Sequence, residues 1–191
     1  MISAVLLVAC TIDASSARKL IEAKTIHQLE AAYHRIPAGD VAMRALYHHQ
    51  RLALHPTATE ELRFLRTLPS TEAEFRCIYG LGELYNRYDL DPFWTPASAT
   101  VYGDFETAAQ LAVKHHTGHA RVLAFILATW SNAEVGEVSF PEINELLDRD
   151  PEPTADAIRA LPVRDQRQLC GHDVRKRSTK FIVKQCRSEL D

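Results

Sequence analysis

Glycine and cysteine are scarce in this chain of 191 residues, and its positive and negative charges nearly cancel. It has seven glycines and four cysteines, and its formal net charge is −3. So few cysteines exclude a disulfide-dense scaffold, and so small a charge gives no overall field that would favour nucleic acid or an anionic membrane. The composition, 46% hydrophobic and 25% charged, also excludes an intrinsically disordered chain and fits one compact domain.

The sequence also lacks the motifs of several large enzyme classes. It contains no G-x-S-x-G nucleophile elbow, no G-x-x-x-x-G-K phosphate loop and no G-x-G-x-x-G dinucleotide fingerprint. The cysteine spacings include no C-x-x-C pair, so neither a zinc ribbon nor a thioredoxin-type site has support. We therefore assign no catalytic residue and no cofactor, and expect a protein that is not an enzyme.

The chain begins with an apolar run over residues 2–12, well short of the roughly 20 residues that a membrane-spanning helix needs. The small residues at 14–17 follow it and suit a signal peptidase. The sequence therefore predicts a cleaved signal peptide over residues 1–17 and a periplasmic or secreted protein. If residues 1–17 are kept, the run packs on the core and the protein is cytoplasmic. Leu7-Val8-Ala9-Cys10 resembles a lipobox, so lipid attachment at Cys10 is a further alternative.

Two cysteines lie close together near the C-terminus. Cys170 and Cys186 are separated by 15 residues, and a bridge between them would be worth about 3 kcal/mol in the chain-entropy model. We predict this disulfide, which would leave Cys77 as a lone buried thiol. The alternative is that every cysteine is reduced and packed in the core.

Helical periodicity and capping signals run through the whole chain. Apolar residues at 26, 29, 33 and 36 predict one helix that continues to Ile36. Asp40 is expected to cap the next helix, and Asp104 another that runs to His116. Capping boxes predict three more helix starts, at Thr57–Glu60, Thr71–Glu74 and Ser139–Glu142. Further helices are predicted over 120–130, 155–161 and 163–169, the last two after prolines 151 and 153 end the preceding region.

Residues 89–103 contain two prolines and a glycine and predict a long connection between helices. Its aromatic residues Phe93 and Trp94 are candidate contacts for a partner, because long connections in compact domains often carry function. The alternative is that they fold back into the core.

One pattern occurs twice. Arg66-Thr67-Leu68-Pro69 and Arg159-Ala160-Leu161-Pro162 share R-x-L-P, each with a cysteine eight residues after the proline. Both predict a helix end, a proline turn and a new helix, the unit of helical-hairpin repeats. We expect an all-α fold of about nine helices, an irregular antiparallel helical-hairpin stack (a bundle or HEAT-like), as a single domain over residues 18–191.

Several short segments resemble an uncharacterised family of bacterial secreted all-helical proteins. These segments are Leu65–Pro69 with Phe75 and Tyr79, Leu84-Tyr85, Trp130–Val135, and Ala160–Pro162 with Gln166 and Leu169. The family carries acidic residues after the tryptophan, where this chain has Ser131 and Asn132. The resemblance implies an exported helical protein and brings no activity with it.

Histidines offer the clearest metal-binding hypothesis. On a continuous helix, His115 and His119 would share a face at the i, i+4 spacing that lets two imidazoles reach one zinc ion. This would support a metal-dependent hydrolase, although Gly118 weakens the helix and no H-E-x-x-H glutamate is present. The alternative is a group of histidines that binds nothing, as we also expect for His48, His49 and His55.

A basic segment covers residues 164–187, where eight basic and two acidic residues give an excess of +6. Arg175 and Arg177 at its centre are candidate contacts for an acidic partner, for nucleic acid or for an anionic surface. The simpler alternative is a solvated helix face. Together these patterns predict an exported, non-catalytic protein-interaction module with an unknown protein partner. The alternatives are a metal-dependent hydrolase and a binder of nucleic acid or anionic surfaces.

Overall fold

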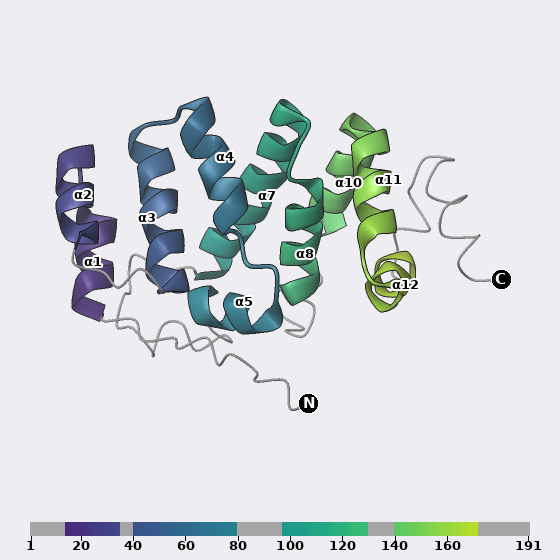
Figure 1. Ribbon diagram of the computed structural model, residues 1–191, viewed down its shortest axis with the longest axis horizontal. Helices are drawn as coiled ribbons and strands as arrows, with labels where there is room; N and C mark the ends of the chain where they lie inside the picture. The colour runs from purple at the N-terminus through teal and green to yellow at the C-terminus, as the bar shows by residue number, and fades with distance from the viewer. Residues whose placement is uncertain (1–13, 35–39, 80–96, 130–139, 172–191) are drawn as a thin grey trace, which may run out of the picture.

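The computed structural model describes residues 14–34, 40–79, 97–129 and 140–171 (Figure 1). Within these ranges the chain is predominantly helical and has no strand, which confirms the all-α prediction. No described helix is both long and apolar enough to cross a bilayer. The helices are α1 (Ala14–Glu22), α2 (Ile26–Tyr33), α3 (Val41–Leu54), α4 (Ala58–Thr67), α5 (Glu72–Tyr79), α7 (Ala97–His115), α8 (His119–Thr129), α10 (Phe140–Arg149), α11 (Pro151–Ala160) and α12 (Val163–Gly171).

The helices follow one another in chain order as a row, from α1 and α2 at the left of Figure 1 to α11 and α12 at the right. Packing contacts connect near neighbours: α3 packs on α1, α2, α4 and α5, α7 packs on α4, α8 and α10, and α11 packs on α8 and α10. Most helices therefore pack on one helix that precedes them and one that follows them in the row, as in helical-repeat proteins.

Aromatic residues from three helices fill the middle of the row. The rings of Phe105 on α7 and Phe125 on α8 lie 4.4 Å apart between centroids, and Phe75 on α5 lies 6.5 Å from Phe125. All three are at most 1% exposed. This explains why the sequence of α8 is apolar on nearly all sides, since the helix has neighbours on several faces.

The capping signals place several helix starts correctly. The Asp40 carboxylate accepts a hydrogen bond from the Met43 amide at 3.0 Å, so α3 begins at Val41 as predicted. The Thr71 hydroxyl accepts from the Glu74 amide, and the Glu74 carboxylate in turn accepts from the Ser70 amide. These bonds satisfy donors that every helix start leaves free.

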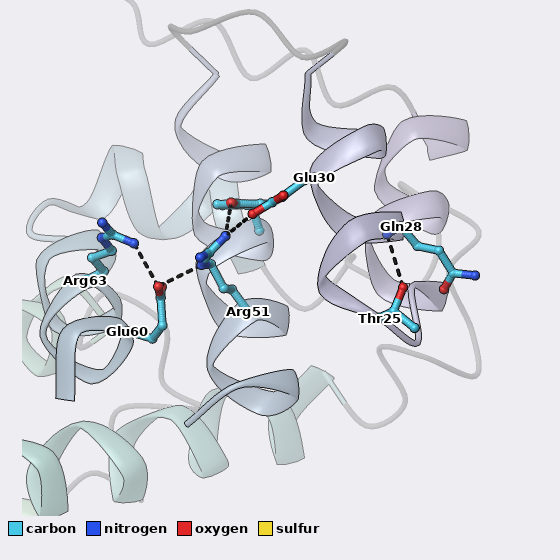
Figure 2. A network of polar contacts seen from close by, with 7 residues as sticks. Thr25, Gln28, Glu30, Arg51, Glu60 and Arg63 are labelled. Carbon is cyan, nitrogen blue, oxygen red and sulfur yellow. Dashed lines mark hydrogen bonds and ion pairs between the residues drawn. The ribbon is translucent and has the colours of Figure 1, made fainter. Parts of the chain in front are cut away.

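The predicted helix up to Ile36 is wrong, because the chain breaks between α1 and α2. Thr25 is extended and its hydroxyl accepts from the Gln28 amide, while the Gln28 side chain accepts from the Lys24 amide. Figure 2 shows the Thr25–Gln28 contact. This T-x-x-Q capping pair starts a new helix, and its signal was present in the sequence.

The predicted cap at Asp104 is also wrong. Helix α7 begins at Ala97, so residues 97–103, which we assigned to a connection, are helical and Asp104 lies inside the helix. Asp104 is 3% exposed and contacts His49 on α3. Its carboxylate therefore contacts another helix and does not cap the start of its own.

The prolines at 151 and 153 start a helix, contrary to the prediction that helix α11 begins near Ala155. Pro151 is the first residue of α11, where the missing amide hydrogen costs nothing. The two R-x-L-P segments do end helices in the same way: Leu68 and Leu161 have extended backbones, with ψ of 141° and 156°. Helices α5 and α12 begin shortly after each proline.

Candidate functional site

Two neighbouring glutamates on α4 connect this helix to the helices on either side. Glu60 is 3% exposed and contacts Arg51 on α3, whereas Glu61 is 7% exposed and contacts Lys114 and His115 on α7. Consecutive residues of a helix point about 100° apart, so one pair of carboxylates can serve two interfaces.

Arg51 is the centre of the first network (Figure 2). Its Nε atom lies 2.8 Å from Glu60 Oε1, and its Nη1 atom donates to Glu30 Oε1 and to the Tyr47 hydroxyl, both at 2.8 Å. Arg63 Nη1 also donates to Glu60 Oε1, at 2.8 Å. The network therefore joins α2, α3 and α4 through one guanidinium group.

Burial and these contacts have opposite effects on the pKa of Glu60. Burial raises this pKa. The hydrogen bond from Arg51 and the charges of Arg51 and Arg63 together lower it by more, so the pKa lies below its usual value. The hydrogen bond to Glu60 is also the main cause that raises the pKa of Arg51. Both groups are charged at neutral pH.

Glu60 Oε2 and His48 Nδ1 are buried at the α3–α4 interface, and neither has a hydrogen-bond partner within the described residues. Burial lowers the pKa of His48, although the nearby Glu60 charge opposes that effect. His48 is therefore held as the neutral imidazole. These atoms are candidates for ordered water, since buried polar groups without protein partners usually bind it.

Glu61 carries the second network, between α4 and α7. Its Oε1 accepts from Lys114 Nζ at 2.7 Å, and its Oε2 lies 2.6 Å from His115 Nε2. The hydrogen bond from Lys114 is the largest effect on the pKa of Glu61, and together with His115 it lowers that pKa despite burial. The carboxylate therefore stays ionised when α4 and α7 pack together.

A third carboxylate, Asp150, joins the α7–α8 turn to the start of α11. Its Oδ2 atom lies 3.0 Å from His116 Nδ1 and 3.0 Å from His119 Nε2. His119 is 4% exposed, and burial lowers its pKa more than Asp150 raises it. The backbone of His116 is left-handed, with φ of 49°, because the chain turns sharply between the two helices.

The structure separates the two histidines of the metal hypothesis. Helix α7 ends at His115 and α8 begins at His119, so they do not lie on one continuous helix. His115 contacts Glu61 and His119 contacts Asp150. Across the described ranges, no group of three or more His, Cys, Asp and Glu side chains could hold a metal ion.

His49 forms a further histidine–carboxylate pair, between α3 and α7. Its Nδ1 atom lies 2.9 Å from Asp104 Oδ1, and its ring contacts Phe64 edge-on. The charge of Asp104 raises the pKa of His49 more than burial lowers it. Sequence analysis missed this pair because its members are distant in the chain and each has an ordinary local pattern.

A pocket of about 240 Å³ lies where the end of α4 meets the α7–α8 turn. Leu62, Leu65 and Arg66 on α4 line one side, and Thr117, Gly118 and Arg121 line the other. Gly118 has φ of +84°, and a Cβ there would lie 3.2 Å from the Leu65 side chain. This close approach of backbone to leucine brings the two sides of the pocket together.

Most of the predicted interaction and disulfide residues lie outside the described ranges. These are Phe93, Trp94, Arg175, Arg177, Cys186 and the lipobox cysteine Cys10. Cys170 lies in α12, but its side chain is not described, so the disulfide stays a prediction. The proposed signal peptidase site after Ala17 falls within α1, before Leu20, which is fully buried.

Comparisons with known proteins give no relative for this chain: no family model, curated protein or solved structure matches it.

Proposed function

We propose that this protein is a non-catalytic helical scaffold that binds another protein, and that it acts after export from a bacterial cell. The observation that supports the binding function is the row of helices, in which most helices pack on one helix before them and one after them in the row (Figure 1). Rows of this kind expose a long surface relative to their core, and helical-repeat proteins use such surfaces to hold partners.

The charged networks fit this function because they fix the helices relative to one another. Glu60, Glu61 and Asp150 each contact side chains from other helices or turns, at distances of 2.6–3.0 Å. A scaffold whose helices are held in this way presents its surface with little rearrangement, which lowers the entropy cost of binding.

Export rests on the apolar run at residues 2–12 and on the small residues that follow it. Intact mass spectrometry of the full chain produced in a bacterial host tests it, with and without reduction and alkylation. We expect loss of about 17 residues and two blocked thiols. An unprocessed chain with four reactive thiols would show that this host does not export the protein.

Binding is tested by cross-linking the full chain in extracts of its own source cells and identifying the proteins attached to it. Each candidate is then purified and titrated against the chain by calorimetry. We expect at least one protein that binds saturably at a fixed stoichiometry. A control with the same charge and helix content, such as a designed helical-repeat protein, should bind none of them. If every captured protein also binds this control, the proposed function is wrong.

A further inference from the structure

The pocket between α4 and the α7–α8 turn combines an apolar floor with positive charge. Leu65 is 2% exposed and Leu62 is half-buried, so the floor is hydrocarbon. Arg66 is exposed on one rim, and Arg121 lies on the other with its side chain 35% exposed. Gly118, directly before α8, lines the pocket, so the N-terminal end of α8, which is the positive end of its dipole, lies beside it.

Arg121 is held in place without being fully neutralised. Its Nε atom donates to the carbonyl oxygen of Leu68 at the end of α4. Its Nη2 atom is 3.6 Å from Glu74 Oε2, which already accepts hydrogen bonds from the amide and hydroxyl of Ser70. A carbonyl oxygen fixes this guanidinium group, and a carboxylate pairs with it only loosely. It can therefore bind a second anion at little entropy cost.

We propose that this pocket binds the C-terminal residue of a protein partner, with an aliphatic side chain on Leu62 and Leu65 and the terminal carboxylate between Arg66 and Arg121. The pocket, at about 240 Å³, is smaller than the usual 300–1,000 Å³ of small-molecule sites. A single residue that carries both an aliphatic group and a carboxylate fits it best, and in proteins this is an aliphatic C-terminal residue. This inference rests on the proposed binding function.

The test uses N-acetyl-L-leucine as the probe and N-acetyl-L-leucinamide as its uncharged match. Binding to the full chain is followed by shifts of backbone amide signals in nuclear magnetic resonance spectra. We expect saturable shifts at Leu65, Thr117 and Gly118, with a dissociation constant of about 1 mM, because one residue offers few contacts. The amide should bind at least about ten times more weakly, since it cannot pair with guanidinium.

Three variants locate the binding. Arg66→Glu should weaken binding of N-acetyl-leucine at least about tenfold by placing a negative charge beside the carboxylate. Arg167→Glu makes the same charge change at an exposed position of α12 that does not line the pocket, and should leave binding unchanged. Leu62→Gln, which keeps the size of the side chain, should weaken binding through the apolar floor. Circular dichroism confirms that each variant is folded.

The outcomes separate this inference from the proposed function. Equal binding of the acid and the amide, or equal loss in the Arg66 and Arg167 variants, would overturn the carboxylate site. A captured partner that binds the Arg66→Glu variant as tightly as the original chain would also overturn it, while the scaffold function would stand. Binding of the probe at the pocket with no protein partner would instead overturn the scaffold function.

Discussion

One oxygen atom of Glu60, Oε1, lies 2.8 Å from Arg51 Nε and 2.8 Å from Arg63 Nη1. A single buried carboxylate thus holds two guanidinium groups, one from α3 and one from its own helix. Arg51 is also largely buried, with 17% of its side chain exposed, whereas Arg63 is 46% exposed. The two ion pairs should therefore contribute very differently to stability.

Replacing Glu60 with alanine should lower the free energy of unfolding by about 3 kcal/mol, because it leaves the buried Arg51 charge with Glu30 alone. Replacing Arg63 with alanine should cost less than about 1 kcal/mol, as for other exposed ion pairs. Urea unfolding followed by circular dichroism at pH 7 measures both. Equal losses for the two variants would contradict the central role of Arg51.

Gly118→Ala should destabilise the fold by about 1–2 kcal/mol, because alanine rarely adopts a positive φ and the new Cβ would crowd the Leu65 side chain. The neighbouring Thr117→Ala changes an exposed residue and should have little effect. Thermal unfolding of both variants gives the comparison. If Gly118→Ala is as stable as Thr117→Ala, the tight turn is not required.

His119 should make the protein less stable in mild acid. Burial lowers the pKa of His119 in the folded state, so the folded protein binds this proton less well than the unfolded chain. Its favourable contribution is complete above the unfolded-state pKa of about 6.5 and is lost as the pH falls below that value. His119→Gln should therefore flatten the decline in unfolding free energy between about pH 6.5 and 5.

The control for this effect is His116→Gln, which removes the other histidine that contacts Asp150. His116 is exposed over 73% of its side chain, so this variant removes the second histidine beside Asp150 while His119 stays buried. A series of urea unfolding curves from pH 5 to 8 tests both. If the slope of unfolding free energy against pH is unchanged in the His119→Gln variant, burial does not lower the pKa of His119.

His49 should have the opposite pH dependence. The charge of Asp104 raises its pKa in the folded state, so its contribution to stability is complete below the unfolded-state pKa of about 6.5. That contribution is lost as the pH rises through the higher folded-state pKa. His49→Gln should remove this loss, which the same urea series would detect above about pH 6.5. If the variant instead loses stability more steeply over this pH range, Asp104 does not raise the pKa of His49.

Local patterns predicted most helix starts, because caps depend on residues within one turn. Asp40 and Thr71 cap where the sequence places them. Asp104 failed for a physical reason: an aspartate in a helix interior looks like a cap in sequence, and only His49 on another helix explains its position. The break at Thr25 could have been predicted, because Gln28 stands three residues after it.

The charged networks and the pocket could not be predicted, because they depend on which helices pack together. In the sequence, Glu60 is only the last residue of a capping box, and no local pattern marks Arg51 as its partner. Figure 2 shows that Arg51 lies between Glu30 and Glu60, which are 30 positions apart in the chain. Sequence spacing carries no information on such contacts until the fold is known.

The row of helices also bears on how the chain folds. The packing joins each part of the row to the parts beside it, as α3 does with α1, α2, α4 and α5, so the two ends of the row need not meet. In a row of this kind, structure can grow outward from a pair of adjacent helices. The carboxylates of Glu60, Glu61 and Asp150 then act late, since each forms its contacts only when two already formed segments meet.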